Sequence, residues 1–171
     1  MTSRFTGNAA RSTGFALVIA ATLGLAPVLV GNAAVAAGPT VVKLTQVGCQ
    51  FIESENGVNL GFKPKKKADC DAINAKTGKA RLAKAKVLEL KPGKYIFRVT
   101  NKNVPYTLGF WLRSYDYDWR NPLHRLTKTS VSGGGLTMGT SRDYVVELKP
   151  GKYKYSCPLN TTPDYTLIVK G

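Results

Sequence analysis

Three cysteines and one histidine carry the most distinctive chemistry of this 171-residue chain. Cys49, Cys70 and Cys157 can pair as a disulfide or offer thiolates to a soft metal. His124 is the single imidazole, which excludes zinc sites with several histidines, two-histidine copper sites and bis-histidine haem ligation. The sequence contains no Ser-His-Asp arrangement, phosphate-binding loop or dinucleotide fingerprint, so we expect a protein that is not an enzyme.

The first 37 residues have the composition of a secretory signal peptide. Arg4 and Arg11 precede an apolar run over residues 15–30, and this run is shorter than the roughly 20 residues of a membrane span. Ala34-Val35-Ala36 then fits a small-residue cleavage site. An uncleaved anchor is the alternative. We expect a periplasmic or secreted protein of 134 residues without a later membrane-spanning segment, its charge reduced from +15 to +13 by loss of the two arginines.

Export would place the cysteines in an oxidising compartment, which favours a disulfide over a thiolate metal site. Three pairings are open. Proximity in the sequence favours Cys49–Cys70, which would attach a basic segment to the first strand. Cys70–Cys157 has no specific support. With the first pairing, Cys157 remains as the cysteine most relevant to chemistry.

Alternating apolar and polar residues predict the strands that would position these side chains. A repeated heptapeptide, Glu89–Tyr95 and Glu147–Tyr153, places a Pro-Gly turn between two strands each time, as expected for equivalent turns in a two-sheet sandwich. The predicted strands cover residues 41–47, 95–100, 143–148, 153–157 and 165–169.

Two segments depart from this pattern. Residues 52–86 form a basic insert that could hold a short helix over residues 69–76, with Asp69 as its N-cap and Gly78 near its end. Residues 114–135 are long for a connection and predict a functional loop, in which three consecutive glycines make a turn.

The insert concentrates positive charge. A run of lysines predicts a docking surface for an acidic partner, for instance a periplasmic redox or metal-transport protein. Nucleic acid is not expected, because no recognition motif is present. Glu53 and Glu55 are interpreted as a solvated face. The docking lysines are Lys63, Lys65, Lys66 and Lys67.

The C-terminal sequence resembles the end of a cupredoxin. Residues 150–158, PGKYKYSCP, match the family's strand that delivers a cysteine to the metal, and a closing strand follows at residues 165–169. Residues 97–106 resemble the family's N-K-x-x-x-P-H corner. The resemblance covers residues 41–51 and 87–171. It implies that residues 38–171 form an all-β, Greek-key β-sandwich of the cupredoxin type with a short helical insert.

The copper ligands of that family are missing. A type 1 copper site uses two histidines, one cysteine and usually a weak axial methionine. Tyr106 stands at the position of the first histidine, and Asn160 stands in the loop after Cys157 where the second is expected. We therefore expect no type 1 copper and no resident cofactor.

Within the family, the chain is most similar to the cupredoxin-like domain of periplasmic EfeO iron-uptake proteins. The similarity lies in Gly48–Phe51 and Tyr155–Pro163, and it implies that Cys49 and Cys157 lie close together and pair. The acidic stretch proposed to bind metal in that family has no counterpart in Leu108–Trp111.

Three functions follow from these observations. The leading one is an exported binding or accessory module in metal-linked envelope chemistry, acting through Cys157 and its loop or through the lysine-rich face. One alternative is a copper or iron protein that uses Cys49, Cys157 and oxygen ligands for electron transfer or metal delivery. The other is a metal-free structural or partner-docking domain.

Overall fold

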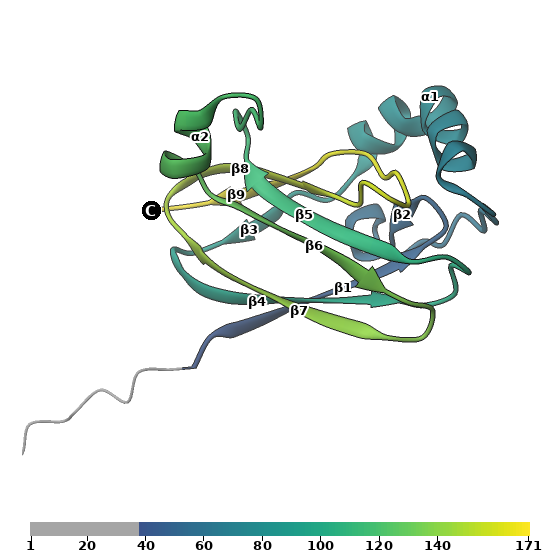
Figure 1. The fold of residues 1–171 in the computed structure, drawn as a ribbon, viewed down its shortest axis with the longest axis horizontal. Coiled ribbons are helices and arrows are strands. Elements are labelled where there is room, and N and C mark those ends of the chain that lie inside the picture. The colour runs from purple at the N-terminus through teal and green to yellow at the C-terminus, as the bar shows by residue number, and fades with distance from the viewer. Residues whose placement is uncertain (1–37) are drawn as a thin grey trace, which may run out of the picture. The chain divides into compact units, whose positions relative to one another are not determined.

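The computed structural model describes residues 38–171, which form a sandwich of two mixed β-sheets (Figure 1). The first sheet has the strand order β2-β1-β4-β7, and the second has the order β3-β9-β8-β5-β6. The strands of the first sheet are β1 (Thr40–Val47), β2 (Gln50–Phe51), β4 (Gly93–Asn101) and β7 (Ser141–Leu148). Those of the second are β3 (Leu88–Leu90), β5 (Leu108–Ser114), β6 (Ser130–Leu136), β8 (Gly151–Ser156) and β9 (Tyr165–Val169).

Each sheet combines one parallel pair with antiparallel pairs. β1 runs parallel to β4, with Val42 beside Phe97, and β3 runs parallel to β9. The remaining neighbours are antiparallel. The predicted fold class, an all-β sandwich with a helical insert, is confirmed.

The five predicted strands are present as β1, β4, β7, β8 and β9. β5 was not predicted because five of its seven residues are buried, so apolar and polar residues do not alternate along it. β6 was not predicted because Gly133, Gly134 and Gly135 were interpreted as a turn, whereas they lie within the strand. A Cβ on Gly133 would come 3.1 Å from the ring of Tyr144, so the strand passes this ring only where the side chain is absent.

The repeated heptapeptide makes the same turn twice, and each turn crosses between the sheets, from β3 to β4 and from β7 to β8. Gly93 and Gly151 both have a φ of 151°, which favours glycine. The hydroxyl of Tyr95 donates to the carbonyl of Lys91 at 2.8 Å, and that of Tyr153 donates to the carbonyl of Lys149 at 2.9 Å. The two identical heptapeptides therefore form the same local structure, including the same tyrosine hydrogen bond.

The core between the sheets is rich in aromatic rings. Phe97 stacks on Phe110 with centroids 5.7 Å apart, and Phe51 meets Phe110 edge-on at 6.1 Å. Tyr155 and Tyr165 complete the cluster, and these rings are almost fully buried. Such pairs add to the hydrophobic free energy of burial.

The insert folds into α1 (Lys67–Lys84), preceded by the short 3-10 helix η1 (Glu53–Glu55). The predicted helix was too short at both ends. Asp69 is not the N-cap residue; it lies in the first turn, and its carboxylate accepts the backbone N–H groups of Lys65 at 2.7 Å and Lys66 at 3.1 Å. Gly78 does not end the helix, because it is a buried position within it. An interior glycine typically costs a helix about 1 kcal/mol relative to alanine.

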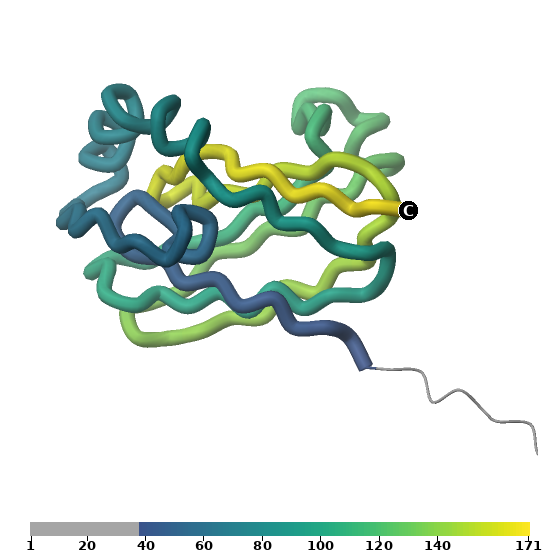
Figure 2. Tube along the Cα trace, turned by 180° about the vertical axis from the view of Figure 1, so that it is seen from behind, coloured from purple at the N-terminus to yellow at the C-terminus, as the bar shows by residue number. Residues whose placement is uncertain are grey.

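The long segment after β5 contains α2 (Pro122–Thr127), which was not predicted. Its N-cap residue Asn121 accepts the backbone N–H of Leu123 at 3.0 Å. α1 and α2 lie at opposite ends of the sandwich, as both views show (Figures 1 and 2). Across residues 38–171, neither helix has the length and apolar composition needed to span a bilayer.

Candidate functional site

The residues that the cupredoxin resemblance assigned to ligand positions converge at the end of the sandwich covered by α1. We call this group the cysteine corner: Cys49, Cys70, Tyr106, Cys157 and Asn160. The hydroxyl of Tyr106 donates to Asn160 Oδ1 at 3.2 Å, and the backbone N–H of Asn160 donates to Cys157 Sγ at 3.2 Å. Tyr106, Asn160 and Cys157 are therefore connected by direct hydrogen bonds.

A disulfide joins Cys49 to Cys70, with their Cα atoms 5.1 Å apart. This confirms the pairing favoured by proximity in the sequence. The Cys49–Cys157 pairing implied by the EfeO resemblance is wrong for this structure, because α1 folds back over the corner and places Cys70 against Cys49. Cys157 is free and buried.

Asn160 connects the parts of this corner. Its Oδ1 accepts the backbone N–H of Cys49 at 2.9 Å and lies 3.2 Å from Cys70 Sγ. Its Nδ2 donates to the carbonyl of Val47 at 2.8 Å. Asn160 therefore joins the end of β1 to the loop that follows Cys157.

Cys157 and Tyr106 are both held in their neutral forms. Burial raises the pKa of the Cys157 thiol, an effect that backbone N–H donors, that of Asn160 first among them, only partly offset. Burial, and the proximity of Cys157 after it, raise the pKa of Tyr106 to about 12. Near neutral pH the corner presents a protonated thiol and a protonated phenol.

These donors do not fit a type 1 copper ion. The corner provides one buried thiol, one phenol and one amide whose oxygen already accepts two hydrogen bonds, and it contains no imidazole. His124 lies in α2, where its Nδ1 accepts the backbone N–H of Asp118 at 3.0 Å. Within residues 38–171, no three His, Cys, Asp or Glu side chains gather as a metal-ligating group.

The predicted metal pair of Cys49 and Cys157 is also altered by the disulfide. Cys49 is bonded to Cys70 and has no thiolate to offer in this state. A copper or iron site at this pair would require prior reduction of that bond, and it stays a prediction for the reduced protein.

The four predicted docking lysines lie together on the surface. Lys63, Lys65, Lys66 and Lys67 are all exposed and lead into the first turn of α1. The Lys67 ammonium pairs with the carboxylate of Asp71 at 2.8 Å, one helical turn away. For the first three, no ion pair is found among the described residues.

Glu55 does not belong to a solvated face, as the sequence suggested. It is 8% exposed, and Arg81 Nε lies 3.1 Å from both of its carboxylate oxygens. The hydroxyl of Tyr165 donates to the same carboxylate. Arg81 also donates to the carbonyl of Cys49 at 2.8 Å, so the ion pair fastens α1 beside the disulfide. The 26-residue separation between Glu55 and Arg81 gave no periodic signal for this contact.

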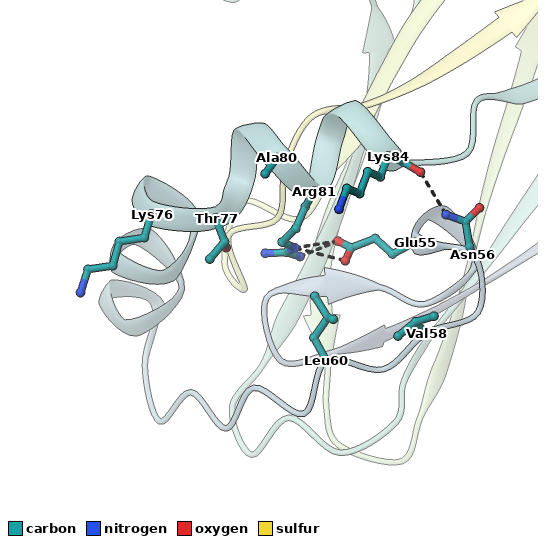
Figure 3. Close-up of a pocket in the computed structure, with 9 residues that line it drawn as sticks. All are labelled: Glu55, Asn56, Val58, Leu60, Lys76, Thr77, Ala80, Arg81 and Lys84. Atoms are coloured by element: carbon teal, nitrogen blue, oxygen red, sulfur yellow. Dashed lines mark hydrogen bonds and ion pairs between the residues drawn. The ribbon is translucent and has the colours of Figure 1, made fainter.

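A cavity of about 410 Å³ opens between α1 and residues 56–60 (Figure 3). Val58 and Leu60 line it on the loop side, and Ala80 and Lys84 line it on the helix side. The Arg81–Glu55 pair lies between these two walls (Figure 3). The sequence gave no indication of this cavity, since its walls are brought together only by the folding of the insert.

Comparison with known proteins found no family model and no curated protein that matches the chain. Auracyanin B is among the solved structures similar to it, with a TM-score of 0.46 and 13% sequence identity. The match covers 77% of this chain and 89% of auracyanin B. A likeness this remote carries no argument about function or metal binding.

Proposed function

We propose that this protein is an exported, non-enzymatic binding module that docks an acidic protein of the cell envelope through Lys63, Lys65, Lys66 and Lys67. The observation that carries the proposal is the exposed run of lysines at the start of a helix that is covalently fixed to the sandwich. The resemblance to EfeO-type domains is the reason for assigning the partner to metal-linked chemistry, as a redox or metal-transport protein.

The position of these lysines supports a role outside the fold. The N-terminus of a helix carries a partial positive charge, so cations placed there destabilise it. Asp69 offsets this by accepting the N–H groups of Lys65 and Lys66, and these hydrogen bonds lower the pKa of its carboxyl group. Lys63, Lys65 and Lys66 therefore do not serve helix stability, and among the described residues only Lys67 of the four forms an ion pair within the helix, with Asp71. The four lysines together provide an electrostatic surface for an anionic partner.

The alternative route through Cys157 is less well supported. Its side chain is 1% exposed and its thiol has a raised pKa, so a partner would reach neither the sulfur nor a thiolate without local opening. The lysine run is accessible as it stands. For this reason the proposal rests on charge and not on thiol chemistry.

The test uses the full chain and poly-L-glutamate as a defined acidic probe, with binding measured by calorimetry at several salt concentrations. We expect the variant Lys63→Gln, Lys65→Gln, Lys66→Gln, Lys67→Gln to bind about tenfold more weakly, since four exposed ion pairs contribute a few tenths of a kcal/mol each. Binding by the parent protein should weaken as salt rises.

A matched control separates this surface from net charge. Lys91→Gln, Lys94→Gln, Lys102→Gln, Lys149→Gln removes the same charge from exposed positions on the sheets and turns. It should bind close to the parent value. Equal weakening of both variants would reject a localised docking surface. Retention of copper or iron in a one-to-one ratio by the reduced protein would instead favour the metal-binding alternative.

A further inference from the structure

Hydrogen bonds hold the loop wall of the cavity between α1 and residues 56–60 in place. Gln50 is fully buried and joins the loop twice, because its Nε2 donates to the carbonyl of Val58 at 2.9 Å and its Oε1 accepts the N–H of Leu60 at 2.8 Å. Asn56 donates to the carbonyl of Lys84 at 3.0 Å and so joins the loop to the end of the helix. The cavity is therefore formed before any ligand arrives.

Apolar side chains line this cavity and are exposed to solvent there. Val58 is 53% exposed and Leu60 is 44% exposed, although the backbone of each is held by a hydrogen bond to the buried side chain of Gln50. Figure 3 shows Leu60 reaching toward α1, on the side where Ala80 lies. Exposed apolar walls around a hollow favour a ligand with an apolar body.

The charge of the cavity is positive. Glu55 is the acidic side chain in its lining, and its carboxylate is already neutralised by Arg81. Lys76 and Lys84 remain, and no ion pair with either is found among residues 38–171. Figure 3 shows the Lys84 side chain extending beside Arg81, whereas Lys76 stands at the far end of the site. An anion near Lys84 would meet uncompensated positive charge.

We propose that this cavity binds a small aliphatic carboxylate, with its hydrocarbon chain between Val58, Leu60 and Ala80 and its carboxylate at Lys84. A volume of about 410 Å³ lies within the range of small-molecule sites in proteins. The site is separate from the lysine run at residues 63–67, and it does not depend on the docking function proposed above.

The test is calorimetric titration of the full chain with octanoate, compared with acetate and with octyltrimethylammonium. Octanoate should bind, acetate should bind at least tenfold more weakly because it lacks the chain, and the cation should not bind because its charge is wrong. In parallel, octanoate should shift the amide NMR signals of Val58, Leu60 and Ala80. This measurement on the parent protein does not depend on any variant folding.

Two variants and two controls locate the site. Leu60→Asn should weaken octanoate binding about tenfold through lost apolar contact, and Lys84→Gln about threefold to fivefold through loss of one partly exposed charge. Leu82→Asn and Lys79→Gln change the same residue types on α1 outside the cavity and should bind as the parent does. Equal affinity for octanoate and octyltrimethylammonium, unchanged binding by Leu60→Asn and Lys84→Gln, or NMR shifts confined to other residues would each overturn the proposal.

Discussion

Two arginine–carboxylate pairs fasten different parts of this sandwich, and their surroundings differ. In the Arg81–Glu55 pair the two side chains are 8% and 7% exposed, whereas in the Arg113–Asp164 pair the arginine is 7% exposed and the carboxylate is 43% exposed. The first pair holds the α1 insert to the fold. The second lies along the second sheet, where Arg113 also donates to Ser156 at 3.1 Å and lies over the Trp111 ring at 3.9 Å.

The two ion pairs differ in how well water can replace the carboxylate when it is removed. Removing the carboxylate leaves an arginine of similar burial in both pairs, 8% exposed for Arg81 and 7% for Arg113. Water can reach the vacated position of the half-exposed Asp164 and offset part of the loss, whereas the Glu55 position is buried. The Arg81–Glu55 pair should therefore be the more sensitive one, even though the contact distances of the two pairs are similar. The Cys49–Cys70 disulfide beside this pair also attaches α1 to the fold, so the attachment combines an ionic and a covalent contact.

The largest effect is expected for Glu55→Gln. The substitution keeps the side-chain shape but leaves Arg81 buried without a counter-charge, and loss of a buried partner typically costs about 3–5 kcal/mol of unfolding free energy. Urea denaturation of the oxidised protein measures this. A loss smaller than that of Asp164→Asn would contradict the comparison.

Breaking the covalent attachment should have the next largest effect. Cys49→Ser combined with Cys70→Ser should lower the free energy of unfolding by about 2–4 kcal/mol, because the bond restricts the unfolded chain. The double variant avoids a new unpaired thiol, and Cys157 serves as the internal control for thiol counting. A midpoint unchanged by the double variant would show that the ion pair alone fixes α1.

Asp164→Asn should cost less, about 1–2 kcal/mol, because Arg113 keeps its contacts with Ser156 and Trp111 and the lost carboxylate was already half-exposed. The same urea denaturation gives the value. A loss equal to that of Glu55→Gln would show that exposure of the carboxylate does not distinguish the two pairs.

The smallest effect is expected from alkaline pH at the cysteine corner. The pKa of Tyr106 is raised to about 12, so this residue contributes stability that is complete below its unfolded value of about 10 and is lost as pH rises through 12. Thermal unfolding between pH 9 and 11 should therefore show a smaller alkaline loss for Tyr106→Phe than for the parent. Identical slopes would mean that Tyr106 ionises as freely in the folded state as in the unfolded chain.

Local patterns were sufficient for part of this molecule. Alternating residues located β1, β4, β7, β8 and β9, and the repeated heptapeptide located two equivalent turns, because both signals reside in a few neighbouring residues. β6 was not predicted, because the residue that packs against one of its glycines is not a neighbour in the sequence. Gly133 lies against the ring of Tyr144, a neighbour that the local sequence does not reveal.

The candidate site also contains features that the sequence predicts and features that it does not. The presence of a single histidine could be read directly from the chain, and it predicted that a two-histidine copper site is not formed. The burial of Glu55 could not be predicted from the sequence, because its partners Arg81 and Tyr165 lie 26 and 110 residues away. A carboxylate in a polar stretch is normally solvated, and only a distant arginine reverses that expectation.

The sequence by itself determined the β-sandwich class, the presence of a single histidine and the concentration of lysines before α1, since each depends on composition or short-range order. The tertiary structure decided between the cysteine pairings that the sequence left open, and it showed that the insert packs over the cysteine corner and borders an open cavity. These outcomes depend on where an 18-residue helix packs, and its position is fixed by contacts between residues far apart in the chain.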